Sequence, residues 1–159
     1  MRKKIHSSGF TIIELLIVVV IIGILSTLVV TTYSGVQAKN RNSDRQASID
    51  TIQGQLETYY VQYSKYPTVD NLNDSVWRQA NLKNLAADNL QDPHWSDKNV
   101  ACAQNGKAVV ATKPAADCVA YQVTGADGSA CDNKAVACAQ YTLTAMLEGG
   151  GKYVKSSLN

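Results

Sequence analysis

The sequence predicts an α+β fold in which a long N-terminal α-helix packs on a small C-terminal antiparallel β-sheet. The first 66 residues contain no proline, so one helix of ~55 residues, or ~80 Å, can run from Phe10 to about Ser64. From residue 109 onward, β-prone blocks alternate with glycine-rich turns. All four cysteines lie after residue 100, in the C-terminal half of the chain.

The chain begins with a basic leader and an apolar segment. Residues 1–9 hold three basic side chains and no acid, and from 10 to 38 the only charged side chain is Glu14. The 21 residues from Phe10 to Val30 would span ~32 Å as a helix, enough to cross the hydrocarbon core of a membrane. We therefore predict that 10–38 is the transmembrane half of the long helix, with the basic N-terminus on the cytoplasmic side. A cleavable secretory signal would have a shorter apolar block and a small-residue cleavage site, which the sequence lacks before Tyr33.

Glu14 is the unusual residue of this segment, because an isolated carboxylate inside a membrane helix costs about 2.5–3.5 kcal/mol and needs a partner or a role. The residues Gly9-Phe10-Thr11-Ile12-Ile13-Glu14 follow a basic leader and precede a long apolar helix. This arrangement closely resembles the class III signal sequence of type IV pilins and type II secretion pseudopilins. The resemblance implies cleavage by a prepilin peptidase between Gly9 and Phe10, N-methylation of Phe10, and an acidic assembly position at Glu14.

The resemblance also implies that the subunits form a helical filament through their apolar helices. In such a filament, Glu14 of one subunit can neutralise the α-amine of Phe10 on its neighbour. Removing one partner of a buried charge pair is strongly destabilising, which suits a device that sets the register between subunits. The alternative for Glu14 is a solvated position at the level of the lipid headgroups.

The second half of the long helix, residues 39–64, is predicted to be amphipathic. Its apolar residues recur at spacings of three and four, which places them on one helical face: Ile49, Ile52, Leu56, Tyr59 or Tyr60, and Tyr63. We expect this face to pack against a globular head formed by residues 65–159, as in the pilin architecture.

Within the head, a turn at Tyr66–Thr68 and a short helix from about Ser75 to Leu85, with Asp74 or Ser75 as its N-cap, are predicted. Asp92-Pro93 marks another turn. Three or four antiparallel strands are expected after it, and the β-prone blocks are 109–111, 119–124, 139–147 and 152–154, with glycine-containing turns at 125–128 and 149–151. A tyrosine-rich end of the long helix and a later L-x-D-P element also resemble pilins and major pseudopilins.

The four cysteines favour disulfides in an exported head, and they permit three connectivities. We favour Cys102–Cys118 and Cys131–Cys138, because each pair closes a local loop around a turn. A zinc site is the alternative, but the sequence has no C-x-x-C spacing and its two histidines lie elsewhere.

No cofactor or metal is expected, apart from a weak possibility of calcium. The resemblance raises it, because major pseudopilins bind calcium in a C-terminal loop, and Asp92, Asp127 or Asp132 would supply the oxygens. The spacing of these residues does not match a twelve-residue calcium loop, and an Asp/Gly-rich turn explains them better. No catalytic arrangement or phosphate-binding loop occurs, so the sequence does not predict an enzyme.

The resemblance implies a structural subunit of a type IV pilus that begins as a single-pass precursor in the cytoplasmic membrane and ends in an extracellular filament. Its partners would be further copies of itself, the prepilin peptidase, the pilus assembly machinery and the membrane. Adhesion, motility and DNA uptake are all possible uses. Two alternatives are a pseudopilin of a type II secretion system and a membrane-anchored binding module that never polymerises. The net charge of +2 falls to −1 without the leader, which does not support nucleic-acid binding.

Overall fold

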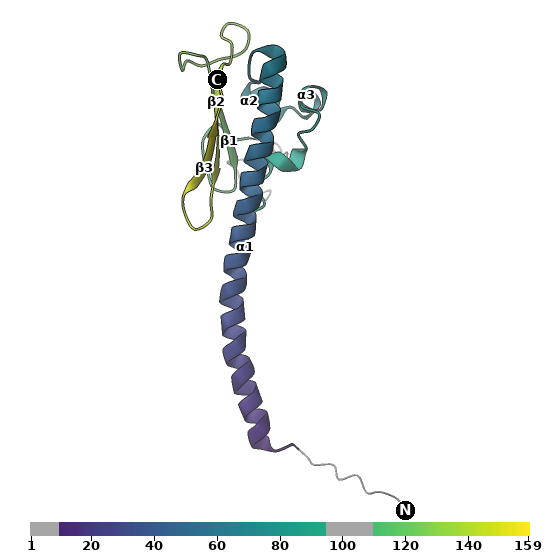
Figure 1. Ribbon diagram of the computed structural model, residues 1–159, viewed down its shortest axis with the longest axis vertical. Coiled ribbons are helices and arrows are strands. Elements are labelled where there is room, and N and C mark those ends of the chain that lie inside the picture. Colours follow the sequence, from purple (N-terminus) through teal and green to yellow (C-terminus); the bar gives the residue numbers. More distant parts are fainter. Residues whose placement is uncertain (1–9, 95–109) are drawn as a thin grey trace, which may run out of the picture. The chain divides into compact units, whose positions relative to one another are not determined.

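The computed structural model describes residues 10–94 and 110–159, except for the side chains of 28–32 and 87–88 (Figure 1). The chain divides into two compact units, Met1–Gln37 and Ala38–Asn159. A long helix followed by a small antiparallel sheet confirms the predicted α+β, pilin-like architecture.

Helix α1 spans Ile12–Tyr63, within two residues of the predicted limits. It ends at Ser64, whose φ of 52° lies in the left-handed region. The Ser64 N–H donates a hydrogen bond of 2.7 Å to the Tyr60 carbonyl and so closes the last turn. Pro67, three residues further on, cannot continue the helix.

In the first unit, every side chain described from Phe10 to Thr27 is exposed. These include large aliphatic residues such as Ile12, which is 87% exposed, and Val18, which is 46% exposed. Across the residues that the structure describes, no helix combines the length and apolarity needed to cross a membrane, so the span predicted for 10–38 is not confirmed.

The core of the second unit forms where one face of α1 meets the sheet. Ile49, Ile52 and Leu56 are fully buried on this face, as the helical spacing predicts. Tyr63 differs from the prediction, because it is 43% exposed. It is the last residue of α1, and its ring lies tilted against that of Tyr59 with centroids 4.4 Å apart, so it covers the edge of the core while part of the ring stays in water.

The sheet has three strands in the order β1-β2-β3: Val119–Thr124, Gln140–Met146 and Lys152–Ser156. Both pairings are antiparallel, and Tyr121 faces Leu143 in the buried middle of the sheet. The predicted block at 109–111 adds only an isolated parallel bridge between Ala111 and Ala120, and Val109 lies outside the described residues. Between β2 and β3, Gly149, Gly150 and Gly151 all have positive φ (84–102°), a conformation that glycine adopts without strain.

Two short helices connect α1 to the sheet. Helix α2, Val69–Asn73, was not predicted, although Thr68 and Asn71 form a reciprocal capping box that the sequence contains. Helix α3, Ser75–Asn81, begins at the predicted N-cap Asp74, which accepts hydrogen bonds from two backbone amides. It ends four residues before the expected Leu85, because Leu82 and Leu85 leave the helix and become buried. A 3₁₀ turn, η1, follows at Ala87–Leu90.

The buried face of α1 can be tested with Ile52→Ala. Ile52 is fully buried, so the truncation removes apolar contacts and leaves a cavity, and we expect a loss of about 2–5 kcal/mol in the free energy of unfolding. The neighbouring Thr51 is exposed, so Thr51→Ala is a matched control with an expected change below ~0.5 kcal/mol. Chemical denaturation monitored by circular dichroism measures both, and equal effects would contradict the assignment of the core face.

Candidate assembly motif and head clamp

The N-terminus of α1 is closed by a capping box between Thr11 and Glu14. The Thr11 N–H and hydroxyl donate to Glu14 Oε2 at 2.8 and 2.7 Å. In return, the Glu14 N–H donates to Thr11 Oγ1 at 3.3 Å. A serine or threonine N-cap followed three residues later by glutamate is the sequence signature of this motif. Of the predicted processing residues, Phe10 is 83% exposed and Gly9 lies outside the described residues.

The capping box gives the Glu14 carboxylate hydrogen-bond partners within its own chain. Within the described residues, both bonds go to Oε2, and Oε1 makes no hydrogen bond. Oε1 is therefore available to a donor from another molecule. The helix dipole also favours a carboxylate in this first turn.

The second unit contains a charged cluster, here called the head clamp, formed by Arg41, Asn42, Arg45, Asp92 and Glu148. Arg45 lies on α1, one turn before Ile49, and its side chain is only 1% exposed. It donates through Nε and Nη2 to the two Asp92 carboxylate oxygens at 2.6 and 2.7 Å. The Asp92 side chain is equally buried. This bidentate ion pair holds the guanidinium and the carboxylate in one plane.

Glu148 attaches the turn between β2 and β3 to the same part of α1. Arg41 donates to its two carboxylate oxygens at 2.6 and 2.5 Å, and Arg45 Nη1 donates to Oε1 at 2.9 Å. The side chain of Asn42 also bonds both backbone polar groups of Glu148. The head clamp therefore joins three segments that are distant in sequence: α1, the turn after η1, and the β2–β3 turn.

The electrostatics of the head clamp depend on charge pairing. Hydrogen bonds from Arg41 lower the pKa of Glu148 from its usual 4.5 to about 2. Hydrogen bonds that Arg45 donates to Asp92 raise the pKa of Arg45, so this guanidinium stays charged although it is buried. A buried pair of this kind adds little net stability, but removal of one partner leaves an uncompensated buried charge.

Sequence reasoning missed the head clamp. It treated Asp92 as a turn residue and a calcium candidate, and it gave Arg45 no role. One signal was available, since Arg45 precedes Ile49 by four residues and therefore continues the buried stripe of α1. A charged residue at such a position requires a buried partner of opposite charge.

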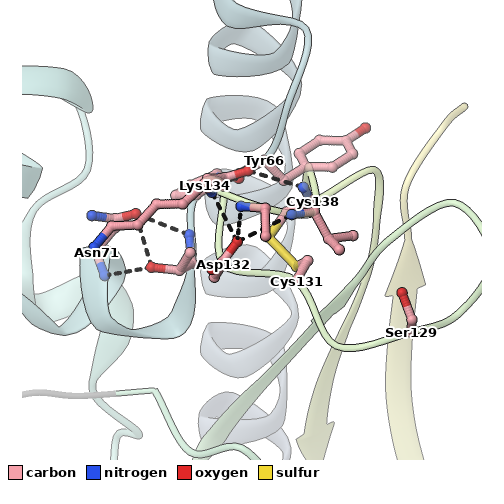
Figure 2. Close-up of a disulfide and its surroundings, with 12 residues drawn as sticks. Tyr66, Asn71, Ser129, Cys131, Asp132, Lys134 and Cys138 are labelled. Carbon is pink, nitrogen blue, oxygen red and sulfur yellow. Dashed lines mark hydrogen bonds between the residues drawn. A yellow bond between two sulfur atoms is a disulfide. The ribbon is translucent and has the colours of Figure 1, made fainter.

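The disulfide loop, residues 131–138, lies beside the end of α1. Cys131 and Cys138 form a disulfide with an S–S distance of 2.04 Å, in the pairing that the sequence favours (Figure 2). Cys118 is also disulfide-bonded, and Cys102 lies outside the described residues. The Tyr66 N–H donates to the Cys138 carbonyl at 2.8 Å, and Asn133 Nδ2 donates to the Tyr66 carbonyl at 2.7 Å. The loop is therefore attached to the turn that follows α1.

The three carboxylates considered for calcium have other contacts. Asp92 binds Arg45, Asp127 accepts the Ser129 N–H at 3.0 Å, and Asp132 Oδ1 accepts three backbone N–H groups, at 2.8 to 3.2 Å. These amide bonds lower the pKa of Asp132. Within the described part of the chain, no three acidic, histidine or cysteine side chains come together as a metal site.

Comparison with known proteins supports the N-terminal motif. The family described as a prokaryotic N-terminal methylation motif matches residues 5–30. The type II secretion system core protein G of Aeromonas hydrophila is 33% identical over 76 residues, which cover 48% of this chain and 52% of that protein. The core protein G of Escherichia coli K12 is 32% identical over 87 residues (55% and 60%), and that of Vibrio cholerae is 36% identical over 70 residues (44% and 48%).

The chain thus matches only about half the length of these curated relatives. No solved structure matches it. The matches confirm the resemblance to pilins and pseudopilins that the residues Gly9 to Glu14 predict. This family consists of structural subunits, not enzymes.

The buried pair of the head clamp can be tested with Arg45→Met. The variant leaves the Asp92 carboxylate buried without its partner, so we expect the free energy of unfolding to fall by about 3–5 kcal/mol. Lys155→Met is the matched control, because the pair of Lys155 with Asp50, 3.2 Å apart, is partly exposed and is expected to contribute less than ~1 kcal/mol. Urea denaturation measures both changes, and a loss for Arg45→Met as small as that of the control would contradict the role given to the pair.

The lowered pKa of Glu148 predicts how the stability of the head depends on pH. Because its folded pKa of about 2 lies below the usual 4.5, its contribution is complete above pH 4.5 and disappears as the pH falls towards 2. Glu148→Gln should therefore be less stable than the native chain at neutral pH, and its stability should decrease less on acidification. Urea denaturation at a series of pH values tests this expectation, and parallel stability curves for the two proteins would refute it.

Proposed function

We propose that this chain, which has the N-terminal motif and the fold of a pilin-like structural subunit, assembles into a type IV pilus filament. It would be inserted as a membrane-anchored precursor, cut between Gly9 and Phe10, and N-methylated at Phe10. The observation that carries the proposal is the combination of the methylation motif over residues 5–30 with an exposed apolar helix that begins at Ile12.

The exposed side chains of α1 require a cover. From Ile12 to Leu25 the helix is aliphatic nearly all round, and its side chains are exposed on every face. Complete burial of one such side chain is worth about 1.5–3 kcal/mol. A helix that is apolar on all sides is stable only within lipid or among other helices. Lipid would cover α1 before assembly, and the apolar helices of neighbouring subunits would cover it in the filament.

Glu14 would select the position at which the helices dock. Its Oε2 already accepts hydrogen bonds from Thr11, which reduces the cost of keeping the carboxylate within an apolar environment. Its Oε1 can accept a hydrogen bond from the α-amine of Phe10 on a neighbouring subunit. Any other register would bury both charges unpaired, and each unpaired charge would cost several kcal/mol.

Two other functions compete with this proposal. The similarity to proteins named type II secretion system core protein G favours a pseudopilin, which shares the motif and the filament principle. A membrane-anchored binding module that never polymerises would need the apolar helix but not Glu14. Long surface filaments built mainly of this protein would support a pilus over both.

The assembly role of Glu14 can be tested with Glu14→Ala. We expect normal membrane insertion and normal cleavage, but at least ~100-fold less filament sheared from cells, as the Phe10 amine would then be buried without its partner. Ser26→Ala is the matched control, since Ser26 is an exposed polar residue of the same helix, and its hydroxyl donates to the Ile22 carbonyl of its own chain.

Quantitative immunoblots of the sheared and membrane fractions give the amounts, and mass spectrometry identifies the N-terminus. An N-methylated Phe10 in sheared filaments is the expected result. An unchanged amount of sheared filament in Glu14→Ala would contradict the proposed register. A chain that keeps Met1 and occurs only in membranes would contradict the proposed maturation.

A further inference from the structure

The outer face of the sheet, which points away from α1, contains a polar cavity of about 470 Å³. Its strand residues come from all three strands: Gln122 and Thr124 of β1, Gln140, Tyr141 and Thr142 of β2, and Ser156 of β3. Ser157 and Asn159, which follow β3, complete the lining. The opposite face of the same strands carries Tyr121 and Leu143, which are fully buried in the core. The alternation along each strand therefore separates an apolar face from a face of amides and hydroxyls.

The strand register arranges these polar groups in two adjacent rows. Gln122 lies opposite Thr142, and Thr142 lies opposite Ser156, so one row crosses the whole sheet. Thr124 and Gln140 form the next row. Since neighbouring strands are about 4.8 Å apart, the long row extends over ~10 Å, about the length of two linked sugar rings.

The hydrogen-bonding capacity of these side chains is unused in the described part of the chain. The amides of Gln122 and Gln140 and the hydroxyls of Thr124, Thr142 and Ser156 have no hydrogen-bond partner there. Each amide or hydroxyl can both donate and accept. A ligand that supplies donors and acceptors in alternation could use them all.

The uncharged side chains of the lining restrict the class of ligand that this cavity can bind. No acidic or basic side chain lines the cavity among the described residues. An anion or a cation would lose its hydration without gaining an opposite charge, and an apolar ligand would leave the amides without partners. A neutral polyhydroxylated ligand avoids both losses, because it needs no opposite charge and its hydroxyls supply hydrogen-bond partners for the amides. We infer that this cavity is a binding site for a neutral carbohydrate.

The affinity of one site is expected to be low. Tyr141 lies in the lining but is only 3% exposed, so it offers no ring on which a sugar could stack. Binding then depends on hydrogen bonds that replace bonds to water, and each contributes only about 0.5–1.5 kcal/mol. If the chain forms the proposed filament, many copies of the site would lie on one surface. Multivalent attachment can exceed the affinity of a single site by about 10²–10⁴-fold.

The test uses the full-length ¹⁵N-labelled chain in detergent micelles, so it does not depend on filament assembly. Maltose and cellobiose are the neutral probes, and sialyllactose is the charged comparison. We expect saturable changes in the side-chain amide signals of Gln122 and Gln140 with a neutral probe, at millimolar concentration. Gln122→Ala should weaken the apparent affinity about three- to tenfold, the loss expected from one hydrogen bond. Gln79→Ala, at an exposed glutamine of α3, is the matched control and should change nothing.

Three outcomes would overturn the inference. These are no saturable change with either neutral sugar, equal binding of sialyllactose, and unchanged affinity in Gln122→Ala. A neighbouring subunit could cover this face instead of a sugar. The variant Thr142→Lys distinguishes a covered face from a free one. Normal filament yield in Thr142→Lys supports a free face, whereas loss of filaments with unchanged folding shows that a second copy covers it. Because we expect Glu14→Ala to leave the micelle titration unchanged, failure of the filament proposal and failure of this one give different results.

Discussion

The head depends on one buried charge, the guanidinium of Arg45. It lies at a core position of α1, where an aliphatic side chain would otherwise be expected, and it remains ionised because Asp92 and Glu148 surround it. Through these two carboxylates, Arg45 attaches the turn after η1 and the β2–β3 turn to α1. The aliphatic core supplies attraction without direction, whereas the planar guanidinium specifies which segments meet and at what angle.

Much of this fold could be predicted because its signals are local. Helical spacing located Ile49, Ile52 and Leu56, and β-prone blocks between glycines located all three strands. Asp74 marked the start of α3 as an N-cap. The exit of Leu82 and Leu85 from the helix could not be predicted, because it depends on a core made by residues from distant parts of the chain.

The two candidate sites differ in the same way. Gly9 to Glu14 form a contiguous motif, so a short stretch of sequence is sufficient to identify it, and the capping box follows from Thr11 and Glu14 alone. The head clamp unites residues separated by 47 and 103 positions. Only tertiary folding brings them together, and the single local sign was the placement of Arg45 within the apolar stripe.

The disulfide loop and the glycine turn of the head differ in how well they tolerate substitutions. Lys134, Ala135, Val136 and Ala137 are exposed. The loop is attached to the turn that follows α1 through the backbone of Tyr66 and Cys138 and the side chain of Asn133. The side chains of residues 134–137 can change while the disulfide and these attachments stay in place. The glycine turn beside Glu148 has no such freedom, since its three positive φ angles exclude most replacements. Sequence diversification among descendants of this chain should therefore concentrate in the disulfide loop, where a changed surface leaves the scaffold intact.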